Sequence, residues 1–180
     1  MNKKLLAQIL IPALIVLSIG AIWIYKNTET LEPKVTESSA DGKESGPVNN
    51  DFILETDEVN IETLSAYGLP IIFDFGSESC DPCRRMKPDL IAVNAAMQGK
   101  AIIKYIDVWE HTDEATGYPI TLIPTQMFIN ADGTPYVPSY DLGIDFMMYN
   151  RKDTGEHALT MHEGMLTEEQ MLLILEDMGV

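Results

Sequence analysis

The stretch that decides the fold is PIIFDFGSESCDPC, residues 70–83 of the 180-residue chain. Its first seven residues form a short apolar run rich in β-branched and aromatic side chains, which predicts a strand buried on both faces of a sheet. Cys80 and Cys83 follow this strand and are the only cysteines in the sequence. Two residues separate them, so both sulfurs lie within reach of one disulfide bond at a predicted helix start. This arrangement indicates thiol–disulfide redox chemistry.

An amphipathic helix is predicted directly after the strand, over residues 82–98. Its apolar side chains recur at helical spacing, at Met86, Leu90, Val93 and Met97. Pro82 fits the first turn, where a proline is tolerated. Cys80 therefore lies at the junction of strand and helix, where free N–H groups and the helix dipole stabilise a thiolate. We expect Cys80 to be the nucleophile and Cys83, one turn inside, to be the resolving thiol.

This segment resembles the active-site segment of the thioredoxin family. The likeness includes an aspartate six positions before the first cysteine, Asp74, and a helix proline five positions after the second, Pro88. Residues 120–129 resemble the family's cis-proline loop and following strand, and residues 163–170 resemble the glycine loop and cap of its last helix. The resemblance covers about residues 51–180. It implies an α/β thioredoxin fold, a central mixed β-sheet flanked by helices.

The resemblance also implies which residues contact a substrate, namely Ile123, Pro124, Asp81, Pro82 and Gly164. Pro124, if cis, places the backbone of Ile123 where it can pair with an extended peptide. The dipeptide Asp81-Pro82 resembles the Glu-Pro of membrane-anchored reductases that serve cytochrome c maturation. No cofactor is implied, because the two thiols carry the electrons.

Asp74 is a third candidate catalytic residue. A carboxylate in an otherwise apolar strand is costly to bury in its charged form, so its pKa should be raised. Such a group suits a base that helps to deprotonate Cys83. The alternative is a partly exposed aspartate at the end of the strand.

A zinc site is the competing interpretation of two cysteines at this spacing. Zinc needs about four ligands, and the remaining candidates are His111, His157 and His162. However, 73 residues separate Cys83 from His157. His157 and His162 also fall on a predicted strand, where positions five apart face opposite ways. We therefore predict no metal site.

The N-terminus predicts a membrane anchor. Residues 5–25 contain 21 residues without a charge, long enough at ~1.5 Å per residue to cross a bilayer core of ~30 Å. Lys3 and Lys4 precede this run, so the positive-inside rule puts the N-terminus in the cytoplasm and the remainder outside. A cleaved secretory peptide, with Ser18 and Gly20 before the cut, is the alternative. We thus expect an anchor over residues 1–25, a flexible linker over 26–50 and a thioredoxin-like domain over 51–180.

Within the domain the predicted order is strand, helix, strand, helix, strand, short helix, two strands and a last helix. Their ranges are 52–55, 57–67, 70–75, 82–98, 101–108, 112–117, 125–130, 157–162 and 167–178. Residues 134–153 form an insertion with several aromatic and methionine side chains. Either it is a docking surface, or it is a loop that folds onto the sheet edge and buries its apolar residues.

The function expected from these features is that of an extracytoplasmic thiol–disulfide oxidoreductase, held in the cell membrane by a single span. It would reduce disulfides in exported proteins, with a membrane thiol–electron carrier as its own reductant. The 28 acidic residues against 12 basic ones would repel nucleic acid, which is not an expected partner. Two alternatives are a disulfide-forming oxidant or isomerase and a non-enzymatic tethered adaptor with a structural disulfide.

Overall fold

The computed structural model describes residues 50–180. The predicted anchor over residues 1–25, and the linker up to residue 49, lie outside the described residues. No helix among residues 50–180 combines the length and the apolar character that a membrane span requires.

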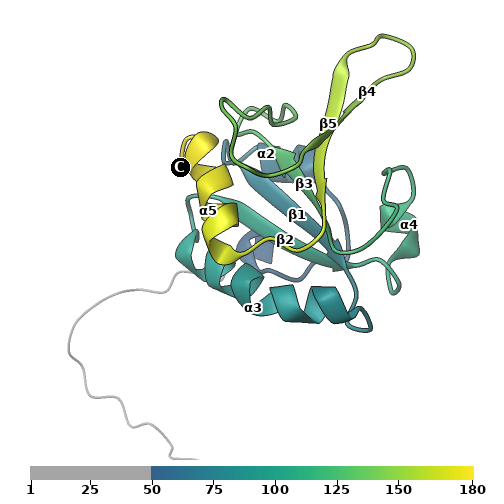
Figure 1. The fold of residues 1–180 in the computed structure, drawn as a ribbon, viewed down its shortest axis with the longest axis vertical. Helices are drawn as coiled ribbons and strands as arrows, with labels where there is room; N and C mark the ends of the chain where they lie inside the picture. Colours follow the sequence, from purple (N-terminus) through teal and green to yellow (C-terminus); the bar gives the residue numbers. More distant parts are fainter. Residues whose placement is uncertain (1–49) are drawn as a thin grey trace, which may run out of the picture. The chain divides into compact units, whose positions relative to one another are not determined.

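The described chain forms one mixed sheet with helices on both faces (Figure 1). In chain order its elements are η2 (Asn50–Phe52), α2 (Ile61–Ser65), β1 (Ile71–Gly76), α3 (Asp81–Ala96), β2 (Ile102–Asp107), α4 (Thr112–Ala115), β3 (Thr125–Ile129), β4 (Met147–Asn150), β5 (His157–Glu163) and α5 (Glu168–Asp177). The strand order is β2-β1-β3-β5-β4. Only β1 and β2 run parallel, and every other neighbouring pair is antiparallel. The mixed sheet flanked by helices that the sequence predicts is confirmed.

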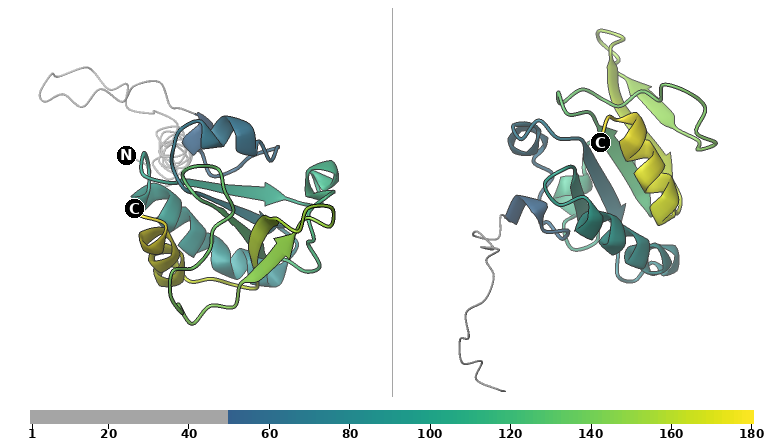
Figure 2. Two further views of the ribbon diagram at one scale, coloured as in Figure 1. Left: turned by 90° about the horizontal axis from the view of Figure 1, so that it is seen from above. Right: turned by 90° about the vertical axis from the view of Figure 1, so that its left-hand side faces the viewer.

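The apolar strand β1 is buried along its whole length, as predicted. Its side chains alternate between two cores because successive residues of a strand point to opposite faces. Ile72 packs under α3 and α5, which lie side by side on one face (Figures 1 and 2). Phe73 and Phe75 pack on the other face with Leu64 of α2. Asp74 shares the face of Ile72, so the sheet register places its carboxyl group under α3.

The start of the domain differs from the prediction. The expected strand over residues 52–55 is reduced to a single bridge between Glu55 and Tyr105. Residues Asn50–Phe52 form the 3-10 turn η2 instead, and the carbonyl oxygen of Phe52 accepts from the side-chain amide of Asn94 on α3 at 3.1 Å. The expected helix over 57–67 is also shorter and spans only residues 61–65.

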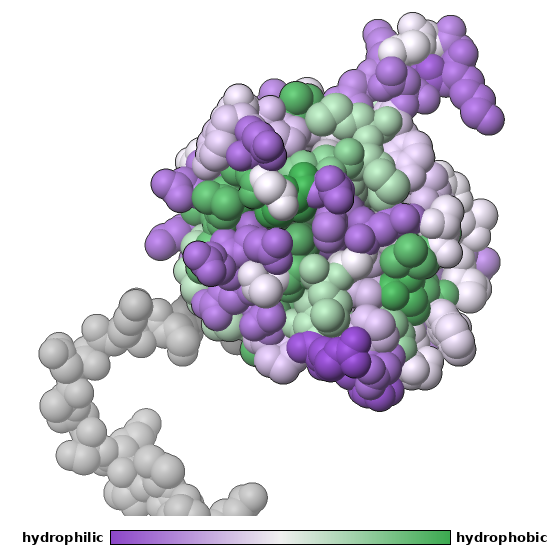
Figure 3. Space-filling model, in the orientation of Figure 1, coloured by the Kyte–Doolittle hydropathy of each residue, from purple (hydrophilic) through white to green (hydrophobic). Residues whose placement is uncertain are grey.

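The insertion at about 134–153 adds a strand to the sheet. After β3 the chain turns at Gly133, and β4 then pairs with β5 at the edge of the sheet. Tyr136 is 1% exposed, and Phe146 packs against Tyr136 and Phe128. The Tyr136 hydroxyl donates to Oδ2 of Asp177 at 2.5 Å, which holds the insertion to the end of α5. Tyr136 therefore belongs to the core, and Phe146 is partly buried against it. The tip of the β4–β5 hairpin is hydrophilic (Figure 3).

Candidate active site

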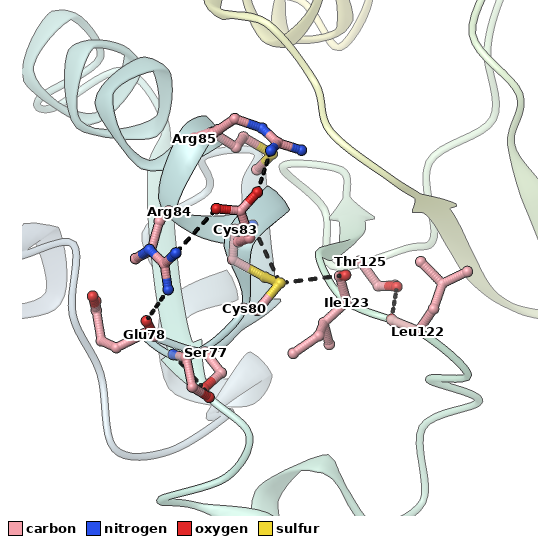
Figure 4. Close-up of a disulfide and its surroundings, with 12 residues drawn as sticks. Ser77, Glu78, Cys80, Cys83, Arg84, Arg85, Leu122, Ile123 and Thr125 are labelled. Carbon is pink, nitrogen blue, oxygen red and sulfur yellow. Dashed lines mark hydrogen bonds and ion pairs between the residues drawn. A yellow bond between two sulfur atoms is a disulfide. The ribbon is translucent and has the colours of Figure 1, made fainter.

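Cys80 and Cys83 form a disulfide at the N-terminus of α3 (Figure 4). Cys80 is the N-cap residue, and its Sγ accepts a hydrogen bond from the N–H of Cys83 at 3.2 Å. The helix begins here because Pro82 in its first turn has no N–H to leave unpaired. Cys80 is half-buried, whereas Cys83 is only 4% exposed. An incoming molecule can therefore approach Cys80 more readily than Cys83.

The loop that carries Cys80 is held by Asp107 at the end of β2. Its carboxylate accepts from the backbone N–H of Glu78 at 2.9 Å and from that of Trp109 at 2.9 Å. Burial alone would raise the pKa of Asp107, but these backbone donors and that of Glu110 outweigh burial and lower it. Asp107 thus fixes the loop in its ionised form. A carboxylate directly after an apolar strand is the sequence signal that could have indicated this role.

Asp81 lies beside the disulfide with its charge paired. Its carboxylate forms an ion pair with Arg84 at 3.0 Å and a second with Arg85. Arg84 also donates to the carbonyl oxygen of Glu78 at 3.2 Å. These side chains are exposed, so the pairs are screened by solvent and contribute little to stability. They nevertheless place two positive charges four and five residues after Cys80 in the sequence.

The loop before β3 faces Cys80 directly (Figure 4). The Ile123–Pro124 peptide bond is cis, and the carbonyl oxygen of Ile123 lies 3.6 Å from Sγ of Cys80. Thr125 supports this loop by donating from Oγ1 to the Leu122 carbonyl at 2.7 Å. Within residues 50–180 the N–H of Ile123 donates no hydrogen bond to the backbone. A main-chain donor beside the sulfurs is therefore open to a bound peptide.

Gly164 completes the rim of the site. Its N–H donates to the carbonyl oxygen of Pro124 at 2.9 Å, which joins the loop after β5 to the cis-proline loop. Its φ of 121° lies in the region that favours glycine, so a side chain here would strain the backbone. The residues expected from the sequence to contact a substrate are thus carried by three neighbouring segments: the start of α3 (Asp81, Pro82), the cis-proline loop (Ile123, Pro124) and the loop after β5 (Gly164).

Asp74 lies under the start of α3 and is 2% exposed, which rules out the partly exposed alternative. Burial raises its pKa from 3.8 to about 7, against the opposing effects of a hydrogen bond from Gln126 and the charge of Lys87. A methyl group placed on Gly76 would lie 3.5 Å from both Oδ2 of Asp74 and Cβ of Cys83. The distance between Oδ2 of Asp74 and Cβ of Cys83 is therefore at most twice 3.5 Å.

Two residues near Asp74 were not expected from the sequence. Gln126 on β3 is fully buried and donates from Nε2 to Oδ1 of Asp74 at 2.7 Å. Lys87 on α3 lies 4.4 Å from the ring centre of Tyr105 and forms an ion pair with Glu78. Gln126 carries the same sequence signal as Asp74, since it is a polar residue inside an otherwise apolar strand.

The three histidines have other partners. His111 lies 3.5 Å from a carboxylate oxygen of Asp57, and a ring nitrogen of His162 lies 2.9 Å from the carbonyl oxygen of Asp145. His157 contacts the carbonyl oxygen of Leu159 at 3.0 Å. Among residues 50–180 no group of three or more His, Cys, Asp and Glu side chains is placed to hold a metal ion.

Comparison with known proteins finds similarity to thioredoxins. A thioredoxin family model matches residues 53–141. Thioredoxin of Staphylococcus aureus is 30% identical over 83 residues, which are 46% of this chain and 78% of that protein. Mitochondrial thioredoxin of Bos taurus is 36% identical over 67 residues, 37% of each chain, so the match spans less than two fifths of the bovine protein.

A crystal structure of chloroplastic thioredoxin z aligns with a TM-score of 0.47 and 23% identity, over 70% of this chain and 96% of that one. The family assignment depends on the sequence matches together with the Cys80–Cys83 disulfide beside a cis-proline loop. The chain therefore belongs to the thioredoxin family, and its two cysteines form the Cys80–Cys83 disulfide at the start of α3.

Proposed function

We propose that this protein is a thiol–disulfide oxidoreductase that reduces disulfides in exported proteins, held by its N-terminal segment on the outer side of a membrane. The observation that carries the proposal is the accessibility difference within the redox pair. Cys80 caps α3 and faces the cis-proline loop, whereas Cys83 is buried behind it and close to the carboxyl group of Asp74.

The chemistry follows from these positions. The thiolate of reduced Cys80 attacks one sulfur of a substrate disulfide, forms a mixed disulfide and expels the second substrate sulfur as a thiolate, which takes a proton. Asp74 then accepts the proton of Cys83, and the Cys83 thiolate attacks Sγ of Cys80. The Cys80–substrate bond breaks, its electron pair leaves with the substrate sulfur, and the Cys80–Cys83 disulfide remains. A thiol donor must reduce this disulfide before the next cycle.

An extended peptide suits the surface around Cys80. The free N–H of Ile123 can pair with a substrate carbonyl in the manner of an added β-strand. Leu122 and Met165 flank this position, and each is 48% exposed. Main-chain pairing with few side-chain pockets would accept many sequences. The substrate class is therefore a flexible segment that contains a disulfide.

Sequence features support both the reductive direction of the reaction and the location of the domain outside the membrane. Proline at position 82, and isoleucine before Pro124, resemble the reducing branch of the family. The uncharged run over residues 5–25 and the lysines before it support a single span with the domain outside. A membrane thiol–electron carrier would then supply electrons. An adaptor role is less well supported, because Tyr136 of the insertion is buried in the core and Phe146 packs against it.

The test is reduction of insulin disulfides by the full-length protein in detergent, with dithiothreitol as the donor. We expect a faster reaction than with dithiothreitol alone, and no acceleration by the Cys80→Ser variant. Oxidation of reduced test proteins without reduction of insulin would favour the oxidant. Absence of both activities would favour the adaptor. Protection of a C-terminal tag from protease in intact cells would contradict the outward location.

A further inference from the structure

We propose that Gln126 is a positioning residue for the resolving step: its side-chain amide, oriented by the carbonyl oxygen of Gly164, holds the Asp74 carboxylate ready to accept the proton of Cys83. This inference rests on the proposed function, because it assigns a residue to one of its steps.

The sheet register brings Gln126 and Asp74 together. They are direct partners in the antiparallel pair of β1 and β3, and Tyr105 and His162 continue the same row on β2 and β5. Directly opposed residues have Cβ atoms about 5 Å apart. At this separation the Gln126 and Asp74 side chains can form a hydrogen bond with each other. The bond from Nε2 of Gln126 to Oδ1 of Asp74 measures 2.7 Å, and both side chains are buried.

The carbonyl oxygen of Gly164 determines which way the amide points. Nε2 of Gln126 also donates to this oxygen, at 3.2 Å. If the amide were reversed, its oxygen would face two acceptors, the Asp74 carboxylate and the Gly164 carbonyl. Among residues 50–180, Oε1 of Gln126 is one of the buried side-chain atoms without a hydrogen-bond partner. The amide thus leaves its acceptor unpaired while its donor side binds Asp74.

A fixed donor matters because of the environment of Asp74. Burial favours the neutral acid, whereas a donated hydrogen bond favours the carboxylate, which is the form that can take a proton. The titratable groups that face Asp74 are Lys87 and Cys83 on α3 and Tyr105 on β2, with His162 one strand further away beside Gln126. The ammonium group of Lys87 also forms ion pairs with Glu55 and Glu78, which weaken its attraction to the Asp74 carboxylate. Gln126 is the hydrogen-bond donor in direct contact with the carboxylate.

The same contact also joins the base to the substrate-binding rim. Gly164 accepts from Gln126 through its carbonyl oxygen and donates to Pro124 through its N–H. One chain of hydrogen bonds therefore runs from Asp74 through Gln126 and Gly164 to the cis-proline loop. The base and the loop that faces Cys80 are held in one geometry.

The test uses Gln126→Met, which keeps an unbranched side chain of similar length and removes the donor. Gln126→Leu is a second apolar variant if the first folds poorly. Met127→Leu is the matched control, because Met127 is equally buried on β3 but packs on the opposite face of the sheet. The full-length oxidised protein in detergent is labelled with ¹³C at aspartate carboxyl groups and titrated. Because both cysteines are held in the disulfide, no thiol titrates in this experiment. The carboxyl resonance of Asp74 is identified as the one that is lost in Asp74→Asn.

We expect the titration midpoint of Asp74 to rise by about one pH unit or more in Gln126→Met and to stay unchanged in Met127→Leu. In single-turnover experiments, release of substrate from the Cys80 mixed disulfide should slow by about fivefold at pH 7, and its pH profile should move upward with the carboxyl group. In an Asp74→Asn background, Gln126→Met should leave the profile where it is.

An unchanged midpoint in Gln126→Met would overturn the inference, even if the variant were less stable, since loss of stability alone indicates a structural role. A midpoint that rises while the profile of substrate release stays fixed would overturn it as well. The carboxyl titration needs no catalytic turnover. It therefore still reports on the contact between Gln126 and Asp74 if the wild-type protein proves to have no reductase activity, which is a failure of the proposed function instead.

Discussion

Asp74 and Gln126 face each other across β1 and β3, with 2.7 Å between the carboxyl oxygen Oδ1 and the amide nitrogen Nε2. The contact lies on the face of the sheet that α3 covers, below the two cysteines. A buried acid with a pKa of about 7 makes the stability of the protein depend on pH.

The first prediction concerns stability. The folded pKa of Asp74 lies above its ordinary value of 3.8, so its contribution to stability is greatest below pH 3.8 and is lost as the pH rises through about 7. Replacing it by Asn removes the buried charge. We expect Asp74→Asn to raise the free energy of unfolding at pH 8 by up to roughly 4 kcal/mol, and to change it little at pH 4. Urea unfolding at both pH values measures this. Lower stability at pH 8 would mean that Asp74 is mainly a structural acceptor for Gln126.

The second prediction assigns the two thiols. Cys83→Ser leaves the accessible sulfur of Cys80 able to attack, but removes the group that resolves the intermediate. We expect Cys83→Ser to accumulate mixed disulfides with exported proteins, detected as dithiothreitol-sensitive bands on non-reducing gels. Cys80→Ser is the matched control and should trap far less. The reverse pattern would exchange the two roles.

Much of this fold could be predicted from the sequence because its signals are local. The buried strand before Cys80 and the amphipathic helix after it are encoded by the spacing of apolar residues, and both occur as predicted. Residues 52–55 look like a strand locally, but Phe52 ends the turn η2, and its carbonyl oxygen accepts from Asn94, 42 residues away in the sequence, instead of pairing with β2. Such a contact leaves no trace in the pattern of residues 52–55.

The candidate site also combines residues with a clear local signal and residues whose role depends on long-range contacts. Asp74 could be singled out because one carboxylate in an apolar strand is unusual. Gln126 gives the same signal, yet its meaning depends on the register of β1 against β3, which the sequence does not specify. The sequence does not predict the strand β4, for a related reason. Its residues 147–150 gain their partner only when β5 lies beside them.

The third prediction concerns Gly76. A methyl group here would lie 2.7 Å from Cε2 of Tyr105 and in the space between Asp74 and Cys83. We expect Gly76→Ala to lower the free energy of unfolding by about 1–3 kcal/mol, because the buried ring must move, and also to slow substrate release. In a Tyr105→Val background, which removes the ring, Gly76→Ala should cost much less than it does in the wild type. Equal stability of Gly76→Ala and the wild type in urea would show that the ring of Tyr105 does not pack tightly against Gly76.

The fourth prediction concerns the insertion. Burial alone would raise the pKa of Asp177, but hydrogen bonds from Ser139 and Tyr136 outweigh burial and lower it. Its contribution to stability is therefore present at neutral pH and is lost as the pH falls through the folded pKa. We expect Asp177→Asn to lower stability by about 1–2 kcal/mol at pH 7 and to speed hydrogen exchange in β4.

Glu176→Gln is the control for this change, because Glu176 is a neighbouring exposed carboxylate on α5. Equal effects of the two substitutions would indicate a general effect of charge at the end of α5. The contact between Asp177 and the insertion would then not be what holds residues 134–146 in place.

The reduction potential of the Cys80/Cys83 couple tests the central claim most directly. It can be measured on the full-length protein by equilibration in dithiothreitol redox buffers, followed by alkylation of the free thiols. Thioredoxin-type reductants lie near about −270 mV and strong oxidants near about −120 mV. A reductase of exported proteins should give a value close to the first of these. A potential above about −170 mV would contradict the reductase and support a disulfide-forming oxidant.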